Sequence, residues 1–329
     1  MNPPALPPLL ISEVGPRDGL QSVKAAMPTA AKKRWLSALA ASGLREIEVA
    51  SFVSPKLLPQ MADAAELVAH ALTLPGLQVA ALAPNLKGAQ AAMQAGVHKL
   101  TIPVSVTEAH SLANVRKTLA QMDDEVRAIV ALRNAAHPAV VLEAGLSVAF
   151  GCTLAGAVSD AQTLRLAHAM AACGVDEVGL SDTSGCANPT QVRRLFTALM
   201  RELGPHAGGA HFHNTRGQGL ANVVAALDAG VTTFDASQGG LGGCPYAPGA
   251  SGNIVTEDLV FLLEAMGHPT GVDMARLLLA RQALREGLPG EPLYGQLADA
   301  GLPLGFVYAD GRTPDAATTA STCIPGAPA

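Results

Sequence analysis

The chain has 329 residues, of which 49% are hydrophobic, 3% aromatic and 15% charged, and its formal net charge is −5. This apolar content is enough for a sizeable core, and the absence of a basic stripe interleaved with aromatic residues argues against nucleic-acid binding. The apolar runs are broken by glycine, proline or charge well before the roughly 18 residues that a membrane-spanning helix needs.

The N-terminus and the cysteines indicate the compartment. The opening stretch, MNPPALPPLLISEV, lacks the basic start and the cleavage site of a signal peptide. The five cysteines contain no CxxC pair and no regular spacing, so they do not form a disulfide framework. We therefore expect a cytoplasmic protein with no membrane association.

Short apolar runs alternate along the chain with Ala- and Leu-rich segments of helical period. The expected strands are LLISEV, REIEVASF, LQVAALAP, HKLTIPVS, VVLEAGLSVA, DEVGLSDT, GAHFHN and VTTFDAS. The expected helices cover 30–42, 61–72, 86–95, 108–135, 159–173, 189–203, 218–229 and 254–266. Eight such βα units predict an α/β protein whose parallel strands close into a (β/α)8 TIM barrel. An open doubly wound sheet is the alternative, but GPRDGLQ after the first strand is not the GxGxxG of dinucleotide binding.

The segments after the eighth unit complete one domain. The stretch TGVDMARLLLARQALREGLPG predicts an additional helix that covers one end of the barrel. We therefore expect a single catalytic domain over 1–308, with the barrel at about 9–270 and a helical cover at 271–308. The remainder, 309–329, is small, polar and proline-bearing, which predicts a flexible tail that holds Cys323.

Chemically useful residues follow the strands at the end where the active sites of such barrels lie. They are Arg17 and Asp18 after the first strand, Glu48 in the second, Asp182 after the sixth, and His211 and His213 in the seventh. Strand side chains alternate between the two faces, so Glu48 is expected to point into the barrel mouth while Ile47 and Val49 pack on helices.

His211 and His213 share one face of their strand, and Phe212 takes the other. A lone pair of this kind is more often a hydrogen-bonded core pair than a metal site. Here Asp18 ends the first strand, which neighbours the eighth in a closed barrel, and this favours coordination. An aspartate, two imidazoles and an amide oxygen from Asn253 fit Mg²⁺ or Mn²⁺ better than a structural zinc.

Three other residues have two interpretations each. Arg17 beside Asp18 is either a surface ion pair or part of an active-site loop. Asp182 in LSDTSG either caps a turn or reaches the site. Cys244 lies in the glycine-rich loop QGGLGGCPYAPGASGN, which favours a thiol exposed on a mobile lid over a buried residue.

Several stretches together resemble the 3-hydroxy-3-methylglutaryl-CoA (HMG-CoA) lyase family. They are EVGPRDGLQ, IEVASFVSPKLLPQM, LSDTSG, HFHNTRGQGLAN and GGLGGCPYAPGASGNIVTEDLV, and the likeness spans roughly 9–275. The resemblance implies a divalent-metal lyase of leucine degradation, often a homodimer, that cleaves HMG-CoA to acetyl-CoA and acetoacetate. By position Asp18, His211, His213 and Asn253 resemble its metal ligands. Arg17 resembles the residue that steadies the enolate, Glu48 and Asp182 the supporting acids, and Cys244 the lid thiol, while Asp18 or His211 would act as base.

The chain departs from this family pattern in two loops. Asn214 and Arg216 stand where such lyases commonly have Asp and Tyr, and the fifth loop reads FGCTLAG. We expect these loops to shape the acyl pocket. Citramalyl-CoA is therefore an alternative substrate. A condensing synthase of the isopropylmalate or homocitrate type, and a non-catalytic binder of CoA esters, are the alternatives outside the lyases.

Overall fold

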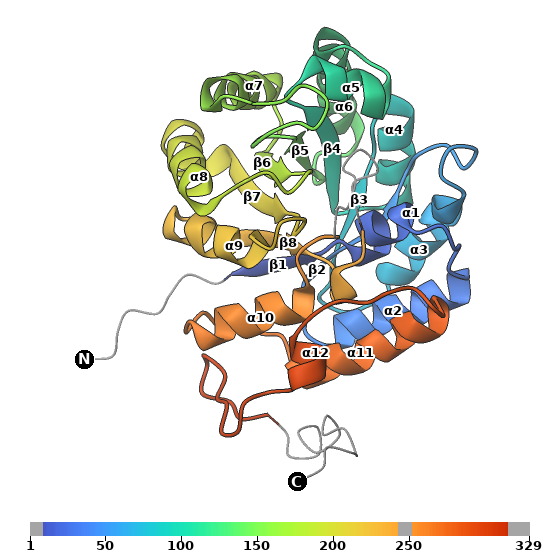
Figure 1. The fold of residues 1–329 in the computed structure, drawn as a ribbon. Coiled ribbons are helices and arrows are strands. Elements are labelled where there is room, and N and C mark those ends of the chain that lie inside the picture. The colour runs from blue at the N-terminus through green and yellow to red at the C-terminus, as the bar shows by residue number, and fades with distance from the viewer. Residues whose placement is uncertain (1–8, 243–251, 315–329) are drawn as a thin grey trace.

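The computed structural model describes residues 9–242 and 252–314, and it confirms the expected barrel. Eight parallel strands pair in chain order, and β8 closes on β1 (Figure 1). They are β1 (Leu10–Glu13), β2 (Glu46–Ser51), β3 (Gln78–Leu82), β4 (Lys99–Ser105), β5 (Val141–Ser147), β6 (Glu177–Asp182), β7 (Ala207–Phe212) and β8 (Thr233–Ala236).

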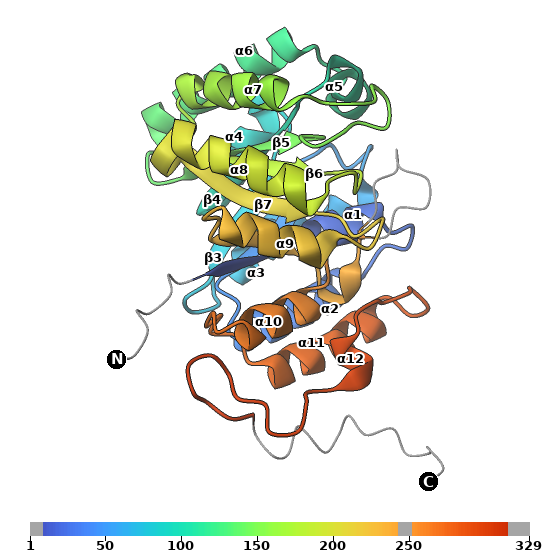
Figure 2. The same cartoon turned by 60° about the vertical axis from the view of Figure 1, so that its left-hand side comes forward.

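A ring of helices surrounds the strands (Figures 1 and 2). It consists of α2 (Thr29–Ala41), α3 (Ala64–Ala71), α4 (Leu86–Ala95), α6 (Leu119–Ala136), α7 (Asp160–Cys173), α8 (Pro189–Leu203), α9 (Gly219–Asp228) and α10 (Thr256–Ala265). Shorter pieces are α1 (Leu20–Ser22), α5 (Glu108–Val115) and α12 (Leu297–Ala300). No helix among the described residues is long and apolar enough to cross a membrane.

The single helix expected over 108–135 is wrong, because the chain breaks there into α5 and α6. Arg116 has a φ of 57°, in the left-handed region that ends a helix. Thr118 then starts α6 with a capping box: its hydroxyl accepts from the Gln121 N–H while the Gln121 side chain accepts from the Thr118 N–H. The Thr-x-x-Gln signal was present in the sequence, but the helical period on both sides concealed it.

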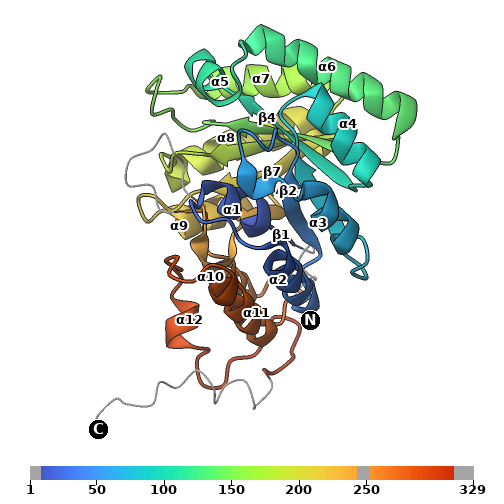
Figure 3. The same ribbon diagram turned by 90° about the vertical axis from the view of Figure 1, so that its right-hand side faces the viewer.

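The additional helix expected after the barrel is present as α11 (Met274–Gly287), but it does not lie across an end. It runs antiparallel to α2 on the outside of the barrel (Figures 1 and 3). At one end of the pair the Asp273 N–H donates to Ser42, 2.7 Å from its carbonyl oxygen. At the other end Gly287 lies against Met27 so closely that a Cβ would come within 2.1 Å of its Cε. The apolar face of α11 is therefore buried on α2.

The apolar core lies between the strands and the helices. In β5 the helix-facing residues Leu142, Ala144 and Leu146 are fully buried. The alternate residues of the strand, which face the barrel interior, are partly exposed. The interior next to these strands is thus accessible to solvent, and it opens at the end where the functional residues lie.

Candidate metal centre

Asp18 is positioned by a tight π-helical turn, Gly15–Gly19, directly after β1. The Asp18 N–H donates to the Val14 carbonyl at 2.7 Å, and the Gly15 N–H donates to the Glu13 carboxylate at 2.8 Å. A Cβ at Gly15 would lie 2.5 Å from that carboxylate oxygen, so the turn requires glycine here. The turn directs the Asp18 carboxylate toward the mouth of the barrel.

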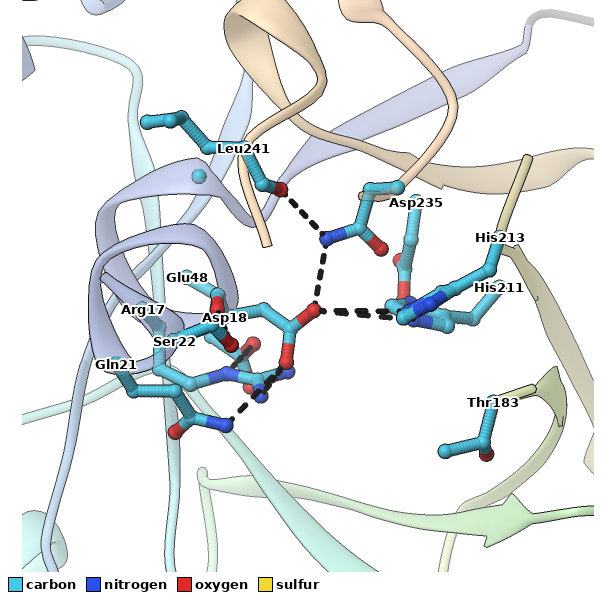
Figure 4. A network of polar contacts seen from close by, with 12 residues as sticks. Arg17, Asp18, Gln21, Ser22, Glu48, Thr183, His211, His213, Asp235 and Leu241 are labelled. Carbon is cyan, nitrogen blue, oxygen red and sulfur yellow. Dashed lines mark hydrogen bonds and ion pairs between the residues drawn. The ribbon is translucent and has the colours of Figure 1, made fainter. Parts of the chain in front are cut away.

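The two histidines face Asp18 from the end of β7 (Figure 4). The Nε2 atoms of His211 and His213 lie 3.1 Å apart, and they are 4.0 and 3.9 Å from Asp18 Oδ2. Phe212 is fully buried on the opposite face, where its ring packs on those of Phe150 and Phe196. The alternation expected for this strand is therefore confirmed.

Asp235, which the sequence did not single out, orients His211. Its Oδ2 lies 3.0 Å from His211 Nδ1, and this contact leaves Nε2 facing Asp18 and His213. Asp235 lies on β8 in register with His211. The only signal was an acid in VTTFDAS on the strand next to β7, and its pairing depends on the register of the two strands.

Burial and neighbouring charges set the protonation of the cluster. Burial lowers the pKa of His213 to about 4, assisted by the positive charge of His211, so His213 offers a neutral nitrogen. Burial also acts to lower the pKa of His211, but the hydrogen bond and charge of Asp235 outweigh it and raise the value. Burial opposes ionisation of Asp18, yet Arg17 and the two histidines hold its pKa well below the usual range. The cluster thus presents an ionised carboxylate beside a neutral imidazole.

These three residues can hold a cation. Their candidate ligand atoms all lie within 4.8 Å of one another. Asn253 adjoins them, although in this structure its Nδ2 donates to Asp18 Oδ2 at 2.7 Å and to the Leu241 carbonyl at 3.1 Å. Its Oδ1 is buried and has no hydrogen-bond partner among the described residues. Rotation of the amide would turn this oxygen toward Asp18, which is the placement that the expected ligand role needs.

Arg17 and Glu48 form the adjoining charged pair. The Arg17 guanidinium donates from Nε to Glu48, and its Nη1 lies 2.5 Å from Asp18 Oδ1. Both Arg17 and Glu48 are buried, and Arg17 lines the cavity. Burial raises the pKa of Glu48 although Arg17 opposes the shift. The active-site position expected for Arg17 and the inward direction expected for Glu48 agree with this geometry.

Asp182 does not belong to the metal cluster. Asp182 accepts the backbone N–H groups of Cys186 at 2.7 Å and of Ala187 at 3.0 Å, so it caps the turn after β6. It does not line the cavity, and burial raises its pKa to about 6. Cys244 lies outside the described residues.

The loops expected to shape the pocket do not line it within the described part of the chain, so that expectation is wrong. Asn214 caps α9 by accepting the Gly219 N–H at 3.0 Å. Arg216 donates to the carbonyls of Ser184 and Gly185 at 3.0 and 2.8 Å, and so ties the turn after β7 to the turn after β6. Neither these residues nor 150–156 contribute to the cavity wall.

The cavity itself has a volume of about 860 Å³ and opens at the C-terminal end of the strands. Asp18, His211, His213 and Asp235 lie on its wall. It is large enough for the acyl end of a CoA ester together with part of its thiol arm, since ligand pockets are typically about 300–1,000 Å³.

The chain is similar in sequence to known proteins over most of its length. The HMGL-like family profile matches residues 9–284. A hydroxymethylglutaryl-CoA lyase of Bacillus subtilis is 40% identical over 86% of this chain and 94% of its own length. A 3-hydroxy-3-isohexenylglutaryl-CoA/hydroxy-methylglutaryl-CoA lyase of Pseudomonas aeruginosa is 42% identical over 83% of this chain and 90% of its own.

Solved structures agree with these matches. An HMG-CoA lyase from Acinetobacter baumannii, solved with coenzyme A and 3-methylmalate, superposes with a TM-score of 0.85 at 38% identity. The superposition covers 91% of this chain and 97% of that one. The likeness thus extends over the whole barrel and is not limited to the motifs.

Proposed function

The chain belongs to the HMGL-like family, and on that premise we propose that it is a carbon–carbon lyase that cleaves HMG-CoA to acetyl-CoA and acetoacetate. The observation that carries the proposal is the meeting of Asp18, His211, His213 and Arg17 on the wall of one cavity. Relatives at about 40% identity that are named as HMG-CoA lyases support the substrate.

The donor set fits a resident divalent cation. Asp18, His211 and His213 would hold it, with Asn253 as a fourth ligand through its Oδ1, which has no hydrogen-bond partner among the described residues. One carboxylate, two imidazoles and an amide favour Mg²⁺ or Mn²⁺ over a closed zinc shell. When bound, the cation would lower the pKa of the tertiary hydroxyl of the substrate and fix its orientation.

The chain's own residues divide the remaining work. Asp18 accepts the proton of the tertiary hydroxyl, because the Nε2 lone pair of His211 would be engaged by the cation; Asp235 keeps that Nε2 directed at the cavity. As the bond between C2 and C3 breaks, its electron pair passes to the thioester carbonyl, and C3 becomes the ketone of acetoacetate. Arg17, held between Glu48 and Asp18, stabilises the enolate oxygen. Cys244 is proposed to protonate the enolate carbon, which completes acetyl-CoA.

The test is a parallel assay of the purified protein, loaded with Mg²⁺ or Mn²⁺, with HMG-CoA and with citramalyl-CoA. Acetyl-CoA release from HMG-CoA supports the proposal, and release from citramalyl-CoA alone would shift it to that substrate. Absence of cleavage of both, with and without a thiol reductant, would reject the lyase function.

Two variants separate the roles of the residues in this assay. His213→Ala should weaken metal binding at least about tenfold, whereas the exposed His168→Ala on α7 should leave it unchanged. Cys244→Ala should lose turnover while metal binding persists, and full activity of that variant would remove the thiol from the mechanism. A homodimer and a cytoplasmic location stay predictions.

A further inference from the structure

The barrel interior next to β4–β8 is open rather than packed. Barrel interiors of this fold are normally filled by layers of side chains. Here the inward positions are partly exposed, at Thr101, Pro103, Glu143, Gly145, Ser147, Ser181, Gly209, His211 and Asp235. The outward positions of β5, by contrast, are fully buried. The cavity therefore continues from the metal centre into the barrel.

Gly145 on β5 contributes to this opening, because a Cβ there would meet only Thr101 Cγ2, at 3.4 Å. Gly145 on β5 pairs in register with Gly179 on β6. Ser181, two residues after Gly179, pairs with His211, so Gly209 lies on β7 near the level of the other two glycines. This layer lies directly below His211. The Glu143 side chain fills the space beside Gly179 and Thr233 packs against Gly209, so the free room lies at Gly145. We call the space that it opens the interior well, lined by Thr101, Pro103, Glu143, Gly145, Ser147, Gly179, Ser181, Gly209 and Asp235.

Apart from Pro103, the side chains of the well are polar. Its walls carry the hydroxyls of Thr101, Ser147 and Ser181. Its carboxylates are Asp235, whose side chain is 30% exposed, and Glu143, which is 15% exposed and lies 2.9 Å from Lys99. The apolar residues Val53, Leu57 and Leu58 also line the cavity, but they belong to the segment after β2 and not to the well.

The position of the well indicates which part of a substrate enters it. If the tertiary hydroxyl at C3 lies at Asp18 and His211, then C3 itself lies at the top of the well. The CoA arm must leave through the open mouth, since it is far too long for the barrel. Two substituents on C3 remain, and the anionic carboxymethyl group is disfavoured beside the carboxylate of Glu143. The other substituent is then the group directed downward, past Gly145 and toward Thr101 and Glu143.

We propose that the interior well binds the C3 substituent of the acyl-CoA and selects one that is longer than methyl and ends in a hydrogen-bond donor such as a hydroxyl. This inference rests on the proposed lyase function. Gly145 supplies the room, and Glu143 with the hydroxyls of the well supplies acceptors that a donor on the substituent can reach and that an apolar chain would desolvate. An isohexenyl group, named for the Pseudomonas aeruginosa relative, has the length but not the donor.

The experiment uses two substrates of equal size. The full chain, loaded with Mn²⁺, is given 3-hydroxy-3-(3-hydroxypropyl)glutaryl-CoA and 3-hydroxy-3-butylglutaryl-CoA, whose side chains have equal numbers of heavy atoms. HMG-CoA is the short reference. We expect kcat/KM for the hydroxypropyl ester to exceed that for the butyl ester about tenfold or more. Equal values, or a preference for butyl, would overturn the inference.

A variant tests the room in the well separately from its polarity. A Cβ at Gly145 would meet only Thr101 Cγ2, at 3.4 Å, so Gly145→Val is tolerated by the fold while its side chain fills the well. We expect the ratio of kcat/KM for the hydroxypropyl ester to kcat/KM for HMG-CoA to fall about tenfold. The matched control, Ala135→Val on the exposed face of α6, should change neither. If Gly145→Val changes kcat/KM for HMG-CoA and for the hydroxypropyl ester by the same factor, the substituent binds elsewhere.

Binding measurements distinguish a failure of this inference from a failure of the proposed lyase function. Dissociation constants of the three CoA esters, measured by calorimetry with metal present, report the preference of the well even without turnover. Cleavage of HMG-CoA without the hydroxypropyl preference would reject the well and keep the lyase. The preference in binding without any cleavage would keep the well and reject the lyase.

Discussion

At the scale of single residues, the two ring nitrogens of His211 face different partners, and these contacts fix the orientation of the ring in the metal centre. Nδ1 is 3.0 Å from Asp235, and Nε2 is 3.1 Å from His213. A ligand imidazole held by a carboxylate is fixed in both tautomer and orientation. At this scale the sequence indicated the histidines, while their carboxylate partner appeared only with the neighbouring strand in place.

Asp235→Asn tests this positioning. The substitution keeps the shape of the side chain but removes the charge that favours the proton on Nδ1. We expect Mn²⁺ affinity, measured by calorimetry, to fall about 10- to 100-fold while the protein stays folded. The control is Asp228→Asn, an exposed partner of Arg193. Unchanged affinity in Asp235→Asn would remove this role.

Arg17→Lys tests the cation beside the reacting carbonyl. Lysine keeps the charge but not the planar guanidinium that contacts both Glu48 and Asp18. We expect kcat for HMG-CoA to fall about 100-fold with a smaller change in KM, because the interaction strengthens as the enolate forms. The exposed Arg194→Lys serves as control. A rise in KM with kcat unchanged would assign Arg17 to substrate binding alone.

At the scale of elements, Glu13 joins three segments that surround the centre. Its carboxylate accepts the N–H of Gln238, in the turn after β8, at 2.9 Å and the hydroxyl of Thr256, at the start of α10, at 2.7 Å. It also accepts the Gly15 N–H in the turn that carries Asp18. Burial raises the pKa of Glu13 to about 8 despite these hydrogen bonds. One buried acid thus connects the turn with Asp18 to the loop that ends at Asn253.

This raised pKa predicts a pH-dependent stability. The fold favours the neutral form, so the contribution of Glu13 is fully present below its ordinary pKa of 4.5 and is lost as pH rises toward about 8. Glu13→Gln stays neutral and keeps an acceptor oxygen for the two N–H groups. In urea unfolding, the free energy of unfolding of the original chain should therefore fall relative to that of Glu13→Gln between pH 5 and 8. A difference that is constant over this range would contradict the assignment.

At the scale of the whole molecule, barrel closure assembles the centre from distant segments. The pairing of β8 with β1 brings the turn with Asp18 beside β7 and β8, and the bridge between His213 and Asn253 joins the last loop to it. The α11 helix packs outside on α2, and its buried Arg281 pairs with Glu257 of α10 at 2.9 Å. A ligand that binds across these segments therefore binds only the closed barrel.

Metal should accordingly stabilise the entire fold. A cation that binds the folded chain at about 100 times its Kd adds roughly 2.7 kcal/mol to the free energy of unfolding. We expect Mn²⁺ to raise the Tm measured by calorimetry and a chelator to reverse the rise. His213→Ala should abolish the rise, whereas His168→Ala should retain it. An equal rise in both variants would place the cation elsewhere.

Local patterns in the sequence were sufficient to predict the strands and helices and many of the site residues. The alternation of apolar strands with helical segments predicted the eight βα units, because each element buries an apolar face with its own period. Residues at strand ends, such as Asp18 and His211, could be assigned to one rim because parallel strands share their direction. The break at Arg116 was a local signal that the helical period outweighed.

Other features of the site depend on strand register and on closure of the barrel, and only the tertiary structure determined them. The pairing of Asp235 with His211, the glycine layer at Gly145 and Gly179, and the direction of the Asn253 amide all join residues from different strands or loops. A shift of one residue in any strand would turn these side chains to the other face. The sequence by itself therefore determined the barrel and the residues at its rim. The packing of one strand against the next decided how those residues are held and how deep the cavity extends.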